Sequence, residues 1–168
     1  MLYALCAALS LALLGLDQWV KHYVTVNIPL GDAQPFLPGL VELRTVHNYG
    51  AAWSSFSGMR WLLVAVTSVI VIAVAVVLLR RIVRHPLGVA AGFLILSGGV
   101  GNIIDRVRLG YVVDMFYFPL FQWNGVPNWL SFLVDSRNYF FGAIFNLADA
   151  YISVAVVYLL IFQYKFFK

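Results

Sequence analysis

Four apolar stretches, separated by segments with more polar residues, dominate the pattern of the chain. They run approximately over 2–20, 61–79, 87–104 and 143–162. A bilayer core of about 30 Å takes roughly 20 helical residues to cross, so each stretch is long enough for one transmembrane helix. The first stretch lacks a basic n-region and ends in "LGLDQ", which does not resemble the small-residue site of signal-peptide cleavage. We therefore expect four spans, with the first one retained.

The two long segments between spans carry different patterns. Residues 21–60 contain turn residues in "NIPLGDAQPFLPG" and continue as "LVELRTV", whose alternation of apolar and polar positions predicts a short strand over 40–46. Residues 105–142 contain Pro119, Pro127 and the aromatic run "FYFPLFQW". Such a composition is typical of a segment that rests at the level of the lipid headgroups.

The composition confirms a membrane protein and indicates its orientation. Hydrophobic residues make up 62% of the chain and charged residues 11%, with a mean hydropathy of +0.89. Soluble domains average about 45–50% apolar and about 25% charged residues. The net charge is +4, and the sequence has no lysine-rich stretch. Both observations argue against nucleic-acid binding. Basic residues in short loops stay in the cytoplasm, and "RRIVRHP" and "YKFFK" carry them here. Both termini are therefore expected in the cytoplasm.

This topology gathers polar residues that are far apart in sequence. The segment after the third span and the start of the fourth lie on one side of the membrane, together with Asp105, Asp114, Asn146 and Asp149. The histidines His22, His47 and His85 are scattered without metal-ligand spacing, so we expect no metal site. Chemistry carried out by paired carboxylates needs no organic cofactor either, so none is expected. The lone Cys6 has no plausible base and is expected to be a small packing residue. Among hydrolytic chemistries, paired carboxylates remain.

The two acids of "GNIIDRVRLGYVVDMF" have different surroundings in the sequence. Asn102, Asp105 and Arg106 are spaced i, i+3, i+4, and Gly98, Gly99 and Gly101 precede them as sites of close helix approach. Asp105 beside Arg106 is interpreted as a structural ion pair. Asp114 has apolar neighbours, which would raise its pKa, the usual direction for an acid that changes protonation state. For Asp114 and Asp149, the alternative to a shared role is that they are two unrelated acids, each satisfied by a backbone or arginine partner.

Three further polar groups flank these acids. Asn146 and Asp149 are spaced i, i+3 at the start of the fourth span, and two carboxylates at this level could share a proton and activate water. Asp17 and Lys21 stand one helical turn apart, and we interpret them as a salt-bridged helix end that reaches toward water. The alternative is that they form an anchor that shapes the floor of an active site. In "HNYGAAWS", Asn48 offers hydrogen bonds and Gly50 allows close backbone approach, although an ordinary turn explains both.

Taken together, four blocks resemble the lipoprotein signal peptidases (signal peptidase II), which are bacterial inner-membrane aspartyl proteases. The blocks are "LDQWVK", "HNYGAAWS", "GGVGNIIDRVRLGYVVDMF" and "FNLADAYIS", in the family's order and over nearly the whole chain. The resemblance implies an all-α membrane protein of one domain (1–168), with four transmembrane helices, a small extracytoplasmic β-sheet and a membrane-surface helix or loop. It implies an active site near the outer face of the cytoplasmic membrane.

The resemblance also assigns roles to residues. Asp114 and Asp149 match the catalytic dyad. The positions that line the substrate pocket are Asn48, Asn102, Arg106 and Asn146, and the supporting positions are Asp17, Lys21, Gly50 and Asp105. The implied reaction removes the signal peptide of a diacylglyceryl-modified prolipoprotein by cutting before the lipidated cysteine. The implied partners are these precursors, membrane lipids and cyclic-peptide inhibitors of the globomycin type, with the enzyme a monomer.

Two features depart from the family pattern, and one rival function stays open. Tyr49 and Trp53 are bulkier than the residues usual in their block and could narrow the pocket. The stretch between Asp114 and Asp149 is longer than in many members and could form a lid in the membrane-surface element. The rival is a small proton-coupled transporter, which predicts acids along a path across the membrane. The spans have apolar middles and the acids cluster at one face, which disfavours transport.

Overall fold

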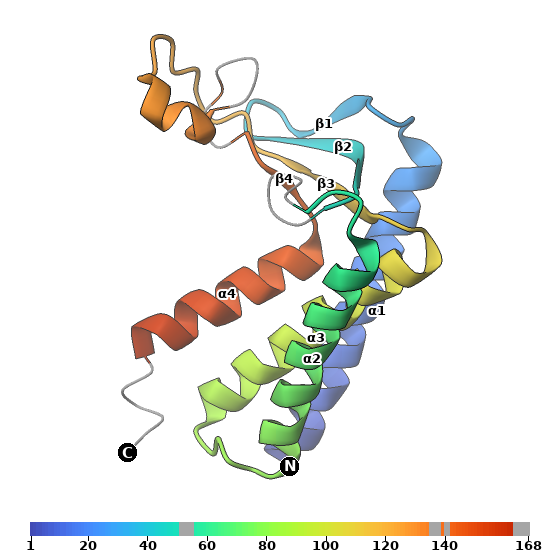
Figure 1. Ribbon diagram of the computed structural model, residues 1–168, viewed down its shortest axis with the longest axis vertical. Helices are drawn as coiled ribbons and strands as arrows, with labels where there is room; N and C mark the ends of the chain where they lie inside the picture. The colour runs from blue at the N-terminus through green and yellow to red at the C-terminus, as the bar shows by residue number, and fades with distance from the viewer. Residues whose placement is uncertain (51–55, 135–138, 140–141, 163–168) are drawn as a thin grey trace. The chain divides into compact units, whose positions relative to one another are not determined.

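The chain folds into two compact units. The computed structural model describes residues 1–50, 56–134, 139 and 142–162 (Figure 1). One unit, here called the helical unit, comprises Met1–Val20, Tyr49–Val112 and Leu147–Lys168. The other, the sheet unit, comprises Lys21–Asn48 and Val113–Asn146.

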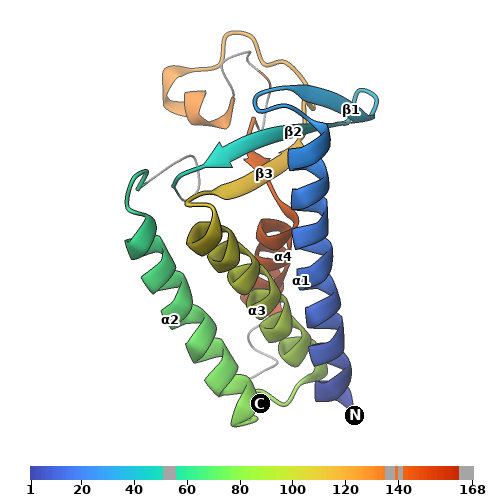
Figure 2. The same ribbon diagram turned by 90° about the vertical axis from the view of Figure 1, so that its right-hand side faces the viewer.

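The helical unit is built around α3. Its helices are α1 (Leu2–Asn27, of which the residues up to Val20 belong to this unit), α2 (Arg60–Leu79), α3 (Pro86–Arg108) and α4 (Leu147–Phe162). Helix α3 packs against both α2 and α4, and it lies between α1 and α2 in Figure 2. In the most apolar 18-residue stretch of α3, half of the residues are buried, whereas only 6% are buried in the corresponding stretch of α2. The exposed side chains of α2 are nearly all aliphatic, as expected for a surface that faces lipid.

Glycines on α3 allow the neighbouring helices to approach closely. A Cβ atom on Gly98 would collide with the main-chain oxygen of Ala148 in α4. A Cβ on Gly99 would lie 2.5 Å from a methyl group of Val71 in α2. Small residues at such crossings let helix backbones come into contact within a membrane. The predicted role of these glycines as sites of close approach is confirmed.

The link between α2 and α3 is tight. Helix α2 ends where Arg81 takes a left-handed conformation with φ of 53°, and α3 begins with Pro86, a residue suited to the first turn of a helix. The hydroxyl of Tyr3 donates a hydrogen bond to the carbonyl of Val83 at 2.8 Å, which ties the start of α1 to this link. Cys6 is buried nearby with Leu78 and Val89, which confirms it as a packing residue.

The sheet unit contains four strands in the order β1-β2-β3-β4. The strands are β1 (Ala33–Leu37), β2 (Val41–Asn48), β3 (Val112–Tyr117, whose first residue falls in the helical unit) and β4 (Ile144–Phe145). Strands β1 and β2 pair as an antiparallel hairpin, and β3 pairs antiparallel with β4, which follows much later in the chain. The last turns of α1 also belong to this unit. Val24 in α1 and Ile28, directly after the helix, are buried. The hydroxyl of Thr45 in β2 donates a hydrogen bond to the Ile28 carbonyl at 2.7 Å.

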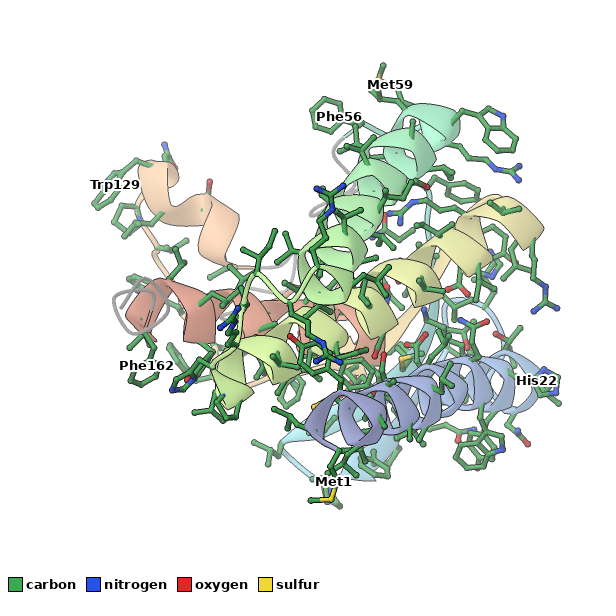
Figure 3. All side chains as sticks on the ribbon, turned by 90° about the horizontal axis from the view of Figure 1, so that it is seen from below. Met1, His22, Phe56, Met59, Trp129 and Phe162 are labelled. Atoms are coloured by element: carbon green, nitrogen blue, oxygen red, sulfur yellow. The ribbon has the colours of Figure 1, made fainter. Side chains whose placement is uncertain are left out.

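A short 3-10 helix, η2 (Asn128–Leu133), lies in the long segment between β3 and β4. Trp129 projects outward from it in Figure 3 and is 74% exposed. Phe121, which precedes η2, is also exposed. Exposed aromatic side chains agree with the sequence pattern of a segment at the membrane surface, and that location stays a prediction. The part of the predicted lid at 135–138 and 140–141 lies outside the described residues.

Several predicted boundaries differ from the observed ones. Helices α1 and α3 continue to Asn27 and Arg108, beyond the predicted ends of the spans. The fourth helix begins at Leu147 instead of 143, because the apolar residues Ile144 and Phe145 pair with β3. The strand predicted over 40–46 is confirmed as β2, whereas β1 lies in a stretch interpreted as turns. Helices α1, α2 and α3 are long and apolar enough to span a membrane, and α4 is a shorter apolar helix of 16 residues.

Candidate active site

Asp114 is held by amide groups on both of its carboxylate oxygens. It lies in the middle of β3 and is 2% exposed. The side-chain amide of Asn48, at the end of β2, donates to its Oδ2 at 2.9 Å. The amide of Asn146, the residue directly before α4, donates to its Oδ1 at 2.7 Å. Both donors come from within the sheet unit, so the sheet itself assembles this group.

This geometry adds polar donors to the sequence-based description of Asp114, which rested on its apolar neighbours alone. Its chain neighbours are indeed apolar and buried, but its hydrogen-bond donors are distant in sequence. Donors to a carboxylate stabilise its charged form and oppose the effect of burial. The surroundings of this acid therefore combine apolar chain neighbours with two polar donors.

Asp149 is held in a similar way within the helical unit. It lies in the first turn of α4, where the partial positive charge of a helix N-terminus stabilises a carboxylate. The amide of Asn102, on α3, donates to its Oδ1 at 2.7 Å. Asn102 is 6% exposed, so this bond is largely protected from water. Asp114 and Asp149 thus both accept asparagine amides, but they belong to different units, and their pairing stays a prediction.

Asp17 contacts the start of α4. Its side chain is fully buried, and its Oδ1 accepts the main-chain N–H of Ala148 at 3.0 Å. Gln18 donates through Nε2 to Oδ2 of Asp17 at 3.2 Å and to Oδ1 of Asp105 at 2.9 Å. Sequence reasoning quoted Gln18 within "LDQWVK" but gave it no role. An amide next to a buried acid in an apolar span was the available signal.

The interpretation of Asp17 and Lys21 as a helix end that reaches toward water is wrong on both counts. Helix α1 continues past Lys21 to Asn27, and both side chains are buried instead of reaching water. Asp17 belongs to the helical unit and Lys21 to the sheet unit, so their ion pair stays a prediction.

Two arginines hold main-chain carbonyls around the end of α3. Arg106 is buried and donates through Nη2 to the carbonyl of Gly50 at 2.8 Å. Arg60, at the start of α2, donates to the carbonyl of Val107 at 2.7 Å, where the last carbonyls of α3 lack helical partners. Sequence reasoning gave Arg60 no role in the site. The ion pair predicted between Asp105 and Arg106 stays a prediction.

The remaining predicted features of the site are partly described. Tyr49 is half exposed and packs edge-to-face on Tyr111 with ring centroids 5.5 Å apart, whereas Trp53 lies outside the described residues. His47 precedes Asn48, and burial lowers its pKa below the usual 6.5, which favours the neutral imidazole. Within the described part of the chain, no three His, Cys, Asp or Glu side chains are placed to hold a metal ion.

Comparison with known proteins identifies the family. The model of a family described as signal peptidase (SPase) II matches residues 9–165. The chain belongs to the signal peptidase II family. A lipoprotein signal peptidase of Streptococcus pyogenes serotype M1 is 40% identical over 162 residues, which cover 94% of this chain and 91% of the relative. A lipoprotein signal peptidase of Streptococcus pneumoniae is 38% identical over 163 residues, or 96% of this chain and 94% of the relative.

One solved structure has a similar fold over nearly the whole chain. It is described as a bacterial membrane enzyme solved by the in meso method at 2.3 Å resolution. The TM-score is 0.77 at 25% identity, with 97% of this chain and 87% of that chain covered. As a signal peptidase II, the chain is a peptidase and a multi-pass membrane protein.

Proposed function

We propose that this chain is an aspartic endopeptidase that cuts the signal peptide from diacylglyceryl-modified prolipoproteins, directly before the lipidated cysteine, with Asp114 and Asp149 as its catalytic pair. The family supports the substrate class, because its curated relatives are lipoprotein signal peptidases. The observation that carries the catalytic assignment is that both carboxylates accept asparagine amides, Asp114 on both oxygens. No finding favours the transporter considered from the sequence.

The chain itself connects the two carboxylates. Asn146 donates to Asp114 and lies only three residues before Asp149. Asn146 thus binds one acid directly and lies close in sequence to the other. We infer that the two units work as one peptidase domain in which the carboxylates hold a water molecule between them.

The chemistry requires one proton acceptor and one proton donor. One carboxylate takes a proton from the water molecule while the water oxygen attacks the peptide carbonyl. The other carboxyl group protonates the departing amine. Asn48, Asn102 and Asn146 hold the carboxylates in place, and Arg106 helps to fix the extended peptide. No metal or organic cofactor takes part in this scheme.

The membrane presents the substrate to this site. The acyl chains of the precursor lie in the bilayer beside the helices, and the peptide bond to be cut lies at the outer interface of the cytoplasmic membrane. Four spans with both termini in the cytoplasm fit this arrangement. The exposed aromatic residues before and within η2 suit contact with the headgroups. The enzyme acts as a monomer.

Cleavage of a purified diacylglyceryl prolipoprotein by the purified chain tests the proposal. Asp114→Asn and Asp149→Asn should each reduce kcat by at least about 100-fold, the usual range for loss of a general acid or base. Asp32→Asn is the matched control, because Asp32 is an exposed acid outside the site. Near-normal cleavage by either site variant, with a normal fold, would overturn the assignment.

Two further experiments test the substrate site and the supporting role of Asp105. A globomycin-type cyclic peptide should inhibit cleavage by the wild-type enzyme, because it competes with the precursor. Asp105→Asn should mainly reduce the yield of folded enzyme, since Asp105 contacts Gln18 of α1. A selective loss of turnover in well-folded Asp105→Asn would contradict this supporting role.

A further inference from the structure

We propose that Asp17 is a positioning residue that sets the place of Asp149 by capping the N-terminus of α4 from another helix. The inference rests on the proposed function, because it matters for catalysis only if Asp149 is catalytic. The first N–H groups of a helix lack partners within that helix and need acceptors. Asp17, on α1, accepts one of them, the N–H of Ala148, at 3.0 Å. Ala148 directly precedes Asp149.

Burial makes this cap stronger than one exposed to water. The side chain of Asp17 has no exposure to solvent, and the residue whose N–H it accepts, Ala148, is also fully buried. A carboxylate at a helix N-terminus gains from both the hydrogen bond and the partial positive charge of the helix. An unsatisfied N–H at this depth would carry a full desolvation cost. The start of α4 is therefore fixed against α1.

A glycine and a glutamine fix Asp17 in turn. A Cβ atom on Gly101 of α3 would lie 2.8 Å from Oδ2 of Asp17, so the carboxylate uses space that only glycine leaves open. The amide of Gln18 donates to the same oxygen and also to Asp105 on α3. Asp17 thus ties α1 to α4, and Gln18 ties α1 to α3.

These contacts determine the geometry around Asp149. The hydrogen bond from Asn102 on α3 to Asp149 on α4 needs the two helices in one register. Asp17 and Gln18 supply that register, because they reach the first turn of α4 and the last turns of α3 at the same time. Loss of the cap should let the first turn of α4 fray and move Asp149 away from Asn102.

The test measures hydrogen exchange and turnover on the same purified variants. In Asp17→Ala, peptides that cover 147–152 should exchange faster than in the wild type, and kcat should fall about tenfold with little change in KM. Asp17→Asn keeps an accepting oxygen, which caps helices about as well, and should recover most of both. Asp32→Ala, which removes an exposed acid of the sheet unit, should match the wild type.

Three results would overturn the proposal. They are wild-type exchange over 147–152 in Asp17→Ala, faster exchange with unchanged kcat, and a loss in Asp17→Asn equal to that in Asp17→Ala. If Asp17→Ala does not fold, Gln18→Leu provides the measurement, and wild-type exchange and turnover in it would overturn the inference. Exchange is read without substrate, so a failure of the catalytic assignment shows itself separately, as an active Asp149→Asn enzyme.

Discussion

At the residue scale, asparagine side chains determine the surroundings of both candidate catalytic acids. The resemblance to the family assigned Asn48, Asn102 and Asn146 to substrate binding, but in the structure their amides point to the carboxylates of Asp114 and Asp149. Each amide has two N–H groups and one oxygen, so an asparagine can hold a carboxylate and still offer a group to a peptide. Holding the acid and contacting the substrate are therefore compatible roles.

Asn146→Ala tests the holding role. Asn146 is fully buried and donates at 2.7 Å to Oδ1 of Asp114, and a hydrogen bond to a charged group is worth about 1.5–3 kcal/mol. We expect kcat to fall roughly 10- to 100-fold, with a smaller change in KM, because the misplaced acid affects turnover more than binding. Steady-state cleavage of a lipidated precursor measures this. The control is Asn124→Ala, at an exposed turn, and a pure KM effect in Asn146→Ala would favour substrate binding instead.

The sequence was enough to single out Asp114 and Asp149 as candidate acids, whose catalytic role stays a prediction, whereas their hydrogen-bond partners could not be predicted. Asp114 was distinguished by its apolar neighbours, which the structure confirms as buried. Its donors are 66 and 32 residues away along the chain, and such contacts depend on strand pairing that no local pattern specifies. The bond from Gln18 to Asp105 spans 87 residues and was missed for the same reason.

At the element scale, the helices were predictable because a membrane demands long apolar stretches, but their ends were not. The fourth helix was expected from 143, since Ile144 and Phe145 are as apolar as a span. Pairing with β3 makes them a strand instead, and the helix begins after Asn146. Tertiary pairing thus overrides local hydropathy at the junction that places Asn146 next to Asp114.

Gly98→Ala tests whether the close approach of α3 and α4 matters. The added methyl group would overlap the carbonyl oxygen of Ala148 and crowd the side chain of Ile152, so the helices must separate. We expect a loss of about 1–3 kcal/mol in stability, typical of overpacking, together with reduced turnover because Ala148 adjoins Asp149. Thermal unfolding in detergent and the cleavage assay measure the two effects.

Gly15→Ala is the matched control for that variant. Gly15 lies in α1, and a Cβ there would meet nothing within 4 Å. Alanine favours helix more than glycine does, so this substitution should be neutral or slightly stabilising. If Gly98→Ala behaved like Gly15→Ala, the helices would have room to spare, and the packing argument for α3 and α4 would fail.

At the scale of the whole molecule, the units alternate along the chain. The helical unit is formed from three separate segments and the sheet unit from two, so the chain passes between units at Val20, Asn48, Val112 and Asn146. Asp114 and Asp149 lie two and three residues beyond the last two of these points. Sequence patterns predicted the helices and one strand, but this alternation emerges only from long-range contacts.

The orientation of the molecule in the membrane gives the last prediction. Arg80, Arg81 and Arg84 are exposed in the short link between α2 and α3, and basic residues in such links are retained in the cytoplasm. Asp32 lies in the segment between α1 and α2, which we then expect on the opposite side of the membrane. In a Cys6→Ala background, a membrane-impermeant maleimide should label Asp32→Cys in intact cells and Ile82→Cys only after permeabilisation. Both sites are exposed, and neither substitution removes a basic residue.

This labelling decides on which side the chemistry occurs. The segment 28–59 lies between α1 and α2, and the segment 109–146 lies between α3 and α4. These two segments share a side if α2 and α3 each cross the membrane, because each crossing reverses the side. Asn48 and Asp114 lie in these two segments and are hydrogen-bonded to each other. Labelling of Ile82→Cys in intact cells would therefore move the proposed catalytic pair to the cytoplasmic face, where a precursor already exported would be out of reach.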